Sequence, residues 1–247
     1  MNKLFRLKYA FNAWIRGYVN EAITAFGHVC SRPHFPSTRF LIFTGGRTGS
    51  TLLQSLLESH PLIHCDGEIL KGKMFDPLRH VERKMERCRL PSYGFKLLSY
   101  QLRDVQTGVK DKRRFIQALC EKGFRIIYLE RRNKTLQAKS VALAMHADLW
   151  HTKGKAPPLR KKVAIPQVEL DRITREIQAL TAFEKEVLQG LEFLHLYYED
   201  HLKSPSRQQR SMPLIFDWLG VPPHHVETDL RKLRSEKYIR AVPSSQF

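Results

Sequence analysis

Short apolar runs recur along this chain at intervals that suit the strands of one sheet. The runs at residues 39–44, 93–98 and 124–130 are apolar without strict alternation, which is typical of parallel strands buried on both faces. Further runs at 62–65 and 192–199 predict two more strands, so the pattern indicates a parallel sheet with helices on both sides.

Stretches of helical periodicity lie between these runs. The first helix places four leucines on one face (Leu52, Leu53, Leu56 and Leu57) and is expected to end near Ser59, because His60-Pro61 stops it. Further helices are predicted at 71–90, 111–123, 133–150, 167–189 and 211–219. The alternation of strands and helices predicts an α/β fold, a three-layer α/β/α arrangement around a central parallel sheet.

Four segments fall outside this alternation. Residues 1–30 carry apolar positions near helical spacing with Lys and Arg among them, which predicts an amphipathic helical extension. A turn-rich linker at 31–38 separates it from a single domain over 39–247. The basic, Pro-containing stretch 152–166 and the tail from Thr228 onward are expected to be irregular.

The charge balance favours an anionic ligand. The 247 residues include 42 Lys and Arg against 24 Asp and Glu, a net charge of +18. Such a surplus attracts nucleotides, sulfated or phosphorylated molecules, nucleic acid or an acidic membrane face, and does not choose among them. A chain of this length can bury a core without disulfides.

Cysteine spacing and hydropathy bear on the compartment. The four cysteines have no metal or disulfide spacing, so we expect reduced thiols in a cytoplasmic protein. No run of about 18 apolar residues predicts a transmembrane helix, and the N-terminus lacks the features of a signal peptide. The N-terminal helix is expected to pack on the main domain; peripheral binding to the inner face of a membrane is the alternative.

The segment from Gly45 to Thr51, GGRTGST, joins the first strand to its helix. In a parallel sheet, ligands bind beyond the carboxyl ends of the strands, where glycines bring backbone amides close to an oxyanion. The N-terminus of the following helix adds unpaired N–H groups. Arg47 supplies a full charge, while the hydroxyls of Thr48 and Ser50 add donors, so this loop is expected to bind an anion.

The loop differs from the Walker A motif, which requires G-x-x-x-x-G-K-[ST]. Here the segment is one residue shorter and no lysine follows Gly49. No acidic strand end that could complete a Mg²⁺ site is evident either. An ordinary ATPase or GTPase therefore fits poorly, and a P-loop kinase with an aberrant loop is kept as an alternative.

A second anion site is predicted after the strand at 124–130. That strand delivers Arg131 and Arg132 to its carboxyl end, and Ser140 follows Arg132 by eight residues, two helical turns further on. A guanidinium can bind a terminal phosphate in bidentate fashion, and a hydroxyl adds a neutral donor. The two arginines compete for this role.

Residues 45–61, GGRTGSTLLQSLLESHP, resemble the 5′-phosphosulfate loop of sulfotransferases that use 3′-phosphoadenosine-5′-phosphosulfate (PAPS). The likeness is greatest to the bacterial carbohydrate branch of Nod-factor and trehalose sulfotransferases. Members of that branch show R-[ST]-G-[ST]-x-L-L, then S-H-P, then G-E. This chain has all three pieces, the last of them at Gly67-Glu68. The eight-residue spacing of Arg132 and Ser140 is similar to the family's 3′-phosphate site and favours Arg132 over Arg131. The resemblance covers roughly residues 39–242 and is thin between the two motifs.

This resemblance implies a P-loop-type fold, PAPS as co-substrate and no required metal. It assigns the donor to seven residues (Arg47, Thr48, Gly49, Ser50, Thr51, Arg132 and Ser140). Arg47 and the loop amides would stabilise the charge that grows on the leaving oxygen. Glu68 is the expected general base, with His60 and His64 as rivals, and Lys96 has weaker support as a contact to the sulfate.

The implied acceptor is a hydroxyl of a glycan or glycolipid. A basic nucleic-acid-binding protein is the alternative from another class, but no helix-turn-helix, zinc-finger or RNA-recognition signature occurs. We therefore expect no nucleic-acid partner. A metal site built on His60, His64 and Cys65 is disfavoured, because Pro61 prevents the two histidines from sharing a regular helix face.

Overall fold

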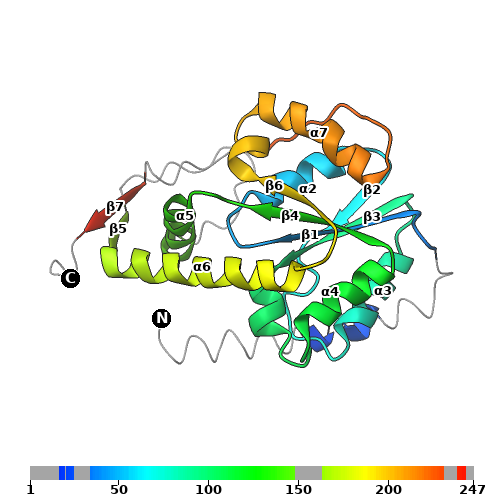
Figure 1. The fold of residues 1–247 in the computed structure, drawn as a ribbon, viewed down its shortest axis with the longest axis horizontal. Helices are drawn as coiled ribbons and strands as arrows, with labels where there is room; N and C mark the ends of the chain where they lie inside the picture. Colours follow the sequence, from blue (N-terminus) through cyan, green and yellow to red (C-terminus); the bar gives the residue numbers. More distant parts are fainter. Residues whose placement is uncertain (1–16, 20, 25–33, 148–162, 231–237, 243–247) are drawn as a thin grey trace.

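A five-stranded, entirely parallel sheet forms the centre of the molecule (Figure 1). The computed structural model describes residues 17–19, 21–24, 34–147, 163–230 and 238–242. Along the sheet the strands follow the order β2 (Ile63–Asp66), β3 (Ser92–Leu98), β1 (Thr38–Thr44), β4 (Phe124–Glu130) and β6 (Phe193–Tyr197). The predicted α/β fold with a central parallel sheet is confirmed.

The three inner strands are buried on both faces, as their continuous apolar runs predict. β1 pairs with β3 on one side and β4 on the other, with Leu41 opposite Phe95 and Ile126. Residues of opposite parity on β1 enter different cores: Leu41 faces one, while Ile42 faces the other. Most polar side chains are therefore found where the strands end, and the loop after β1 lies at such an end.

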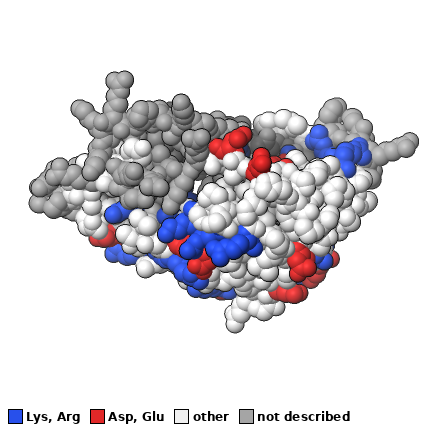
Figure 2. Space-filling view, turned by 90° about the horizontal axis from the view of Figure 1, so that it is seen from above, with Lys and Arg blue, Asp and Glu red and all other residues white. Residues whose placement is uncertain are grey.

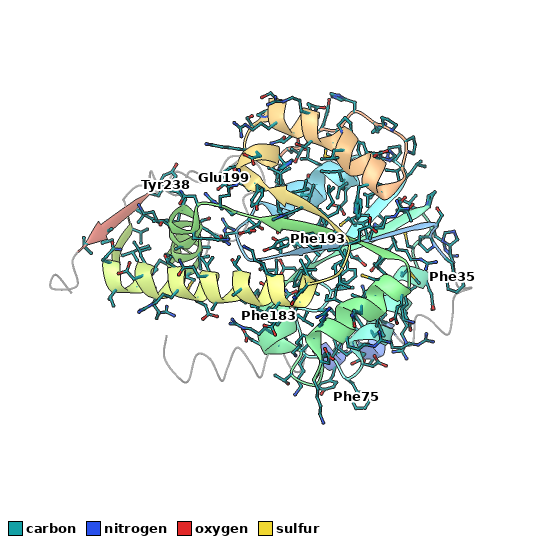
Figure 3. All side chains as sticks on the ribbon, in the orientation of Figure 1. Phe35, Phe75, Phe183, Phe193, Glu199 and Tyr238 are labelled. Carbon is teal, nitrogen blue, oxygen red and sulfur yellow. The ribbon has the colours of Figure 1, made fainter. Side chains whose placement is uncertain are left out.

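Helices cover both faces of the sheet. On one face, α2 (Ser50–Glu58) and α7 (Pro205–Leu219) pack on Ile42 and its neighbours; on the other, the cover comes from α3 (Pro77–Glu86), α4 (Lys112–Glu121) and the C-terminal part of α6 (Gln167–Leu188) (Figure 1). Phe183 and Phe193, labelled in Figure 3, pack against this second core. The layers are those of an α/β/α sandwich.

A small second sheet lies beside the main one and corrects two predictions. β5 (Val163–Pro166) pairs in parallel with β7 (Ile239–Val242), although both segments were expected to be irregular. Ile165 and Ile239 join a third core with α5 (Lys134–Ala147) and the N-terminal part of α6. Each run is only four residues long and its partner is distant in sequence, so no local pattern marks it.

The C-terminal helix is longer than predicted. α7 begins at Pro205 rather than Ser211, because the Ser204 hydroxyl accepts a hydrogen bond from the Arg207 amide and proline suits the first helical position. The polar first turns lack the apolar periodicity on which the prediction rested. Two single-turn π-helices, Gln101–Val105 and Tyr198–Leu202, were also not predicted.

The described part of the predicted N-terminal extension is helical and contacts the main domain. The Glu21 carboxylate accepts hydrogen bonds from the amides of Phe75 and Asp76, at 2.8 and 2.9 Å, just before α3. These contacts join Glu21 to the main domain, while most of the predicted extension, including residues 1–16, lies outside the described part. Within the described residues, no helix combines the length and apolarity needed to span a bilayer.

Candidate functional site

The loop after β1 has a tight backbone shape with two residues in the left-handed region. Arg47 has φ 63° and Gly49 has φ 94°, both in the left-handed region. A Cβ on Gly49 would lie 2.6 Å from the Tyr198 ring, so glycine is required there for space as well as conformation. Gly49 caps α2 without a side-chain hydrogen bond, which leaves the first amides of that helix available to an anion.

Hydroxyl and amide side chains fix the loop to the sheet and to α5. Thr48 Oγ1 lies 2.6 Å from Thr44 Oγ1 and donates to the Gly45 carbonyl at 3.1 Å. From α5, Gln137 Nε2 donates to the Gly46 carbonyl at 2.7 Å. The loop is thus organised before any ligand binds, with its carbonyls turned toward the protein.

Arg47 and Ser140, from the two separate motifs, lie in direct contact. The Arg47 Nε donates to Ser140 Oγ at 3.0 Å, and Arg131 Nη1 donates to the Arg47 carbonyl at 3.3 Å. Burial, and then the charge of Arg131, lower the pKa of Arg47 from its ordinary value. Two guanidinium groups held close together in a partly buried site favour an anion between or beside them.

Arg132, the predicted 3′-phosphate ligand, points outward in this structure. Its guanidinium forms an ion pair with Asp200 and lies 3.8 Å from the centre of the Tyr197 ring. The Arg132 side chain is 52% exposed, whereas that of Arg131 is 9% exposed and contacts Glu199 and Tyr198. The structure therefore brings Ser140 to Arg47 but gives Arg132 no hydrogen bond to Ser140.

Glu199, labelled in Figure 3, orders the start of α5. Its carboxylate accepts from the Arg132 amide at 2.9 Å and from the Asn133 amide at 3.2 Å. Asn133 Oδ1 in turn accepts from the Leu136 amide at 2.8 Å, which caps the helix. The positions of Arg132 and Ser140 are consequently fixed by the residues that follow β6, far away in sequence.

Glu68 lies beside the loop, where a general base is expected. The buried Lys96 Nζ is 3.3 Å from Glu68 Oε1 and donates to Thr51 Oγ1 at 3.2 Å. Gln101 Nε2 donates to Glu68 Oε2 at 2.8 Å. One lysine thus connects the first turn of α2 to the candidate base, and Glu68 remains 23% exposed on its open side.

The two histidines that rival Glu68 lie elsewhere. His60 follows the C-terminus of α2, about 13 Å along the helix from the loop. It is buried, with Nδ1 accepting from the Leu62 amide and Nε2 at 3.0 Å from the Pro222 carbonyl. The His64 side chain is 47% exposed and pairs with Asp66, and the hydrogen bond to Asp66 raises the pKa of His64. Among the described contacts of these two histidines none is with the loop after β1, whereas Glu68 is connected to the first turn of α2 through Lys96.

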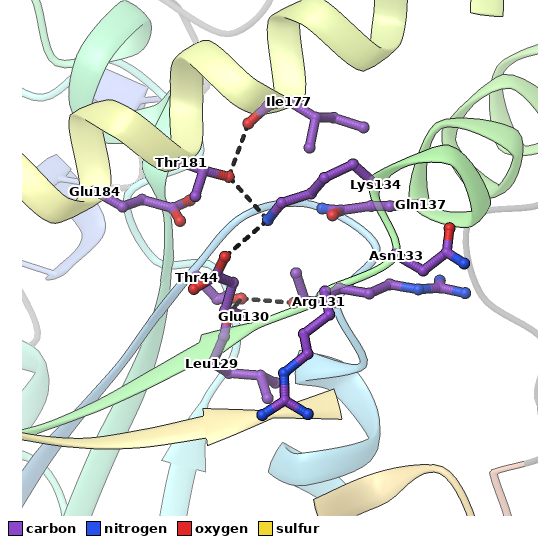
Figure 4. Close-up of polar contacts among 12 residues, drawn as sticks. Thr44, Leu129, Glu130, Arg131, Asn133, Lys134, Gln137, Ile177, Thr181 and Glu184 are labelled. Carbon is purple, nitrogen blue, oxygen red and sulfur yellow. Dashed lines mark hydrogen bonds and ion pairs between the residues drawn. The ribbon is translucent and has the colours of Figure 1, made fainter. Parts of the chain in front are cut away.

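A buried polar cluster supports the loop from behind (Figure 4). Lys134 Nζ joins Glu130 Oε1 at 3.0 Å to Thr181 Oγ1 at 3.1 Å, and so ties β4 to α6. Glu184 accepts from the Tyr128 hydroxyl at 2.8 Å, and a Cβ on Gly45 would lie 3.2 Å from its Oε1. The first glycine of the loop therefore leaves room for this carboxyl group.

The described residues contain no cluster of three or more His, Cys, Asp or Glu that could hold a metal ion. Their cations are the more prominent feature. On the face that carries α7, Lys and Arg gather in a band interrupted by a few acids (Figure 2). The chemistry available to this part of the chain is the binding of anions by guanidinium, ammonium and amide groups.

Three contributors to the site were missed in the sequence. Gln101 is on a π-helical turn with no recognisable pattern, and Glu199 appeared only as part of a structural strand end. Gln137, three residues before Ser140 on α5, is the one that helical spacing could have indicated, because residues three apart share a helix face.

No protein-family model matches this chain, and no curated protein matches it. Among solved structures, the mouse sulfotransferase SULT7A1 complexed with PAP is similar at 13% identity and a TM-score of 0.48, over 77% of this chain and 62% of that one. A sulfotransferase domain from the curacin biosynthetic pathway gives 14% identity and 0.48, over 84% and 85%. The chain thus spans about three fifths of the mouse protein's length, and at such low similarity its function has to be inferred from its own residues.

Proposed function

We propose that this chain transfers a sulfuryl group from PAPS to an acceptor hydroxyl. The observation that carries the proposal is the convergence of three elements on one loop. Arg47 reaches Ser140 of the second motif, while Lys96 joins the first turn of α2 to Glu68. A donor with an anionic group at each end would meet a cation and a hydroxyl at each end.

PAPS, when bound, would supply the activated sulfuryl group on its 5′-phosphate. Arg47 and the free amides at the start of α2 would hold that phosphate and stabilise the negative charge that develops on it. Lys96 is placed to contribute a second charge from the sheet side. Positioning and electrostatics of this kind are the main source of rate enhancement in related group transfers.

Glu68 would take the proton from the acceptor hydroxyl. Its carboxylate accepts from Gln101 and faces Lys96, and these two contacts fix the orientation of the group that would act as the base. The open side of the carboxylate is the direction from which a hydroxyl can approach.

We propose that Arg132 and Ser140 hold the 3′-phosphate. Arg132 is exposed and paired only with surface groups, so a phosphate can replace Asp200 as its partner at small cost. Arg131 would instead hold the loop through the Arg47 carbonyl. A glycan or glycolipid acceptor, no nucleic-acid partner and a cytoplasmic or membrane-peripheral location rest on the sequence resemblance and composition alone.

Calorimetric titration with 3′-phosphoadenosine-5′-phosphate (PAP), in buffer with a chelator, tests the donor site. We expect PAP to bind without metal and ATP with Mg²⁺ to bind weakly or not at all, because no lysine follows Gly49. If ATP with Mg²⁺ binds more tightly than PAP, the kinase alternative replaces this proposal. If neither nucleotide binds, the anion sites have another purpose.

A further inference from the structure

A groove beside Glu68 extends away from the donor loop. Its lining includes Gly67 and Glu68 at the end of β2, Lys71 in the next turn, and one face of α3. The opposite wall comes from Ile23 and Thr24 of the N-terminal helix, which lies beside α3 (Figure 1). Because Lys96 and Thr51 lie on the loop side of Glu68, the groove occupies the side left for an acceptor.

The charges of the groove are strongly one-sided. His80 and Lys84 of α3 and the C-cap residue Arg87 are spaced by four and three residues, so they lie on one face of the helix and its end. Together with Lys71 they give three permanent cations and one imidazole, and Glu68 is the single acid among the described residues that line the groove. None of Lys71, Lys84 and Arg87 forms an ion pair within the described part of the chain. The pKa of Asp66 is lowered, against the effect of burial, by the hydrogen bond from His64 and then by the charge of Lys84.

His80 adds a buried polar group at the floor of the groove. It is 1% exposed, and its Nδ1 has no hydrogen-bond partner among the described residues. Burial, followed by the charge of Lys84, lowers its pKa to about 4, so the ring is neutral at physiological pH. A buried polar atom left without a partner costs free energy unless a ligand or water satisfies it.

We propose that this groove binds the acceptor, and that the acceptor carries an anionic group (a carboxylate, phosphate or sulfate ester) near the hydroxyl that receives the sulfuryl group. Lys84 and Arg87 bind the anion, His80 forms a neutral hydrogen bond, and Glu68 faces the hydroxyl. A neutral polyol would leave the three cations uncompensated. This inference rests on the proposed sulfuryl transfer and names its substrate class.

The test uses the full chain saturated with PAP, so that binding is measured without turnover. A glucuronate tetrasaccharide and its carboxyl-reduced neutral counterpart form a matched pair, and 6-phosphorylated and 6-sulfated glucan tetrasaccharides identify which anion is preferred. We expect at least one anionic probe to bind ten-fold or more tightly than the neutral one in calorimetric titration. Lys84→Gln, alone and with Arg87→Gln, should weaken binding of the anionic probe by roughly ten- to hundred-fold, the scale of charge-assisted hydrogen bonds. Binding of the neutral probe should not change, so the preference is lost.

Lys110→Gln, an exposed lysine outside the groove, is the matched control and should leave the preference unchanged. PAP affinity and the melting temperature of each variant are measured first. If PAP fails to bind the unaltered chain, the proposed function falls. If PAP binds, three results contradict the proposal of an anionic acceptor. The neutral probe binds as tightly as the anionic ones, Lys84→Gln behaves like Lys110→Gln, or no probe binds up to ~10 mM.

Discussion

At the scale of single residues, Arg47 occupies the most constrained position of the site. It adopts a left-handed backbone conformation that costs a non-glycine residue free energy, and it does so in a loop fixed by Thr48 and Gln137. Its guanidinium joins Ser140, and its carbonyl accepts from Arg131. Such strain is maintained because the surrounding contacts determine the loop, and here it places a cation at the start of α2.

Glu68→Gln should abolish turnover and preserve donor binding. The amide has nearly the same shape and still accepts from Gln101, but it cannot take a proton. We expect sulfate transfer from radiolabelled PAPS to acceptors in cell extract to fall by about 10²–10⁴-fold, the usual contribution of a general base. PAP affinity by calorimetry should be unchanged.

His64→Gln is the control for that experiment, since His64 is an exposed imidazole paired with Asp66 on the same strand. It should retain the wild-type rate. A fully active Glu68→Gln variant, or an inactive His64→Gln variant, would move the base to a histidine.

Arg132→Ala should weaken PAP binding by about 1.5–3 kcal/mol, because it removes a charge-assisted hydrogen bond to the 3′-phosphate. Asp200→Asn should act in the opposite direction and tighten binding by up to ~1 kcal/mol, since the exposed Arg132–Asp200 pair no longer competes with the phosphate. Calorimetric titration measures both.

Arg114→Ala provides the matched control, because Arg114 is also an exposed arginine paired with one acid, Glu121, but lies on α4. Unchanged affinity in Arg132→Ala, at the level of this control, would remove Arg132 from the donor site and leave Arg131 as the candidate.

At the scale of elements, the loop and the helix behind it work as a unit. The tight turn into α2 depends on Gly49, and the loop's other side rests on α5 and α6 through Gln137 and Glu184. β4 and α6 are joined by Lys134 between Glu130 and Thr181. Substitutions that shift any of these elements should move the loop and so weaken binding at the proposed donor site.

Gly49→Ala should distort the loop. The left-handed conformation costs an alanine about 1–2 kcal/mol, and contact of the new Cβ with the Tyr198 ring adds to that. We expect a lower free energy of unfolding in urea and loss of PAP binding. Gly108→Ala has no neighbouring atom within 4 Å and should change stability by no more than about 0.5 kcal/mol. Equal behaviour of the two variants would show that the loop geometry is not required.

Glu184→Gln should stabilise the protein at neutral and higher pH. Burial raises the pKa of Glu184 despite its hydrogen bond with Tyr128, so the folded protein retains this proton more tightly than the unfolded chain. The contribution to stability is complete below the unfolded pKa and is lost as pH rises through the folded pKa. The variant keeps the hydrogen bond and has no charge to bury.

Melting temperatures measured from mildly acid to mildly alkaline pH check this expectation. The difference between Glu184→Gln and the unaltered chain should be small in acid and grow with pH. Glu186→Gln changes an exposed glutamate of the same helix and should show no such trend. A Glu184→Gln variant that is less stable at high pH would mean that the carboxylate is ionised and paired in the folded protein.

At the scale of the whole molecule, the net charge of +18 can attract a long polyanion such as nucleic acid, or it can serve only the binding of a small anionic ligand at the site. If the chain binds a small nucleotide, its affinity should fall gently with salt, because few counterions are released. Binding to a nucleic-acid backbone would instead fall with a slope of about −0.9 per phosphate neutralised. We expect PAP binding to persist at ~0.3 M salt, while any association with duplex DNA is lost. Titrations of both ligands across a salt series decide it, and DNA binding that survives high salt would favour the alternative class.

The sequence by itself determined the elements whose signal is local. The apolar runs identified the strands of the main sheet, and glycines before a helix start marked the loop at 45–51 as a candidate anion site. Spacing predicted a pairing of Arg132 with Ser140, but in the structure Ser140 bonds Arg47. Tertiary structure alone decided the rest. The pairing of β5 with β7, the contact of Arg47 with Ser140 and the meeting of Lys96 with Glu68 join residues distant along the chain. The direction of a side chain at a strand end also depends on neighbouring elements. Arg132, for example, forms an ion pair with Asp200 in the turn that follows β6. Periodicity records which face of an element is buried, but not which other element covers it.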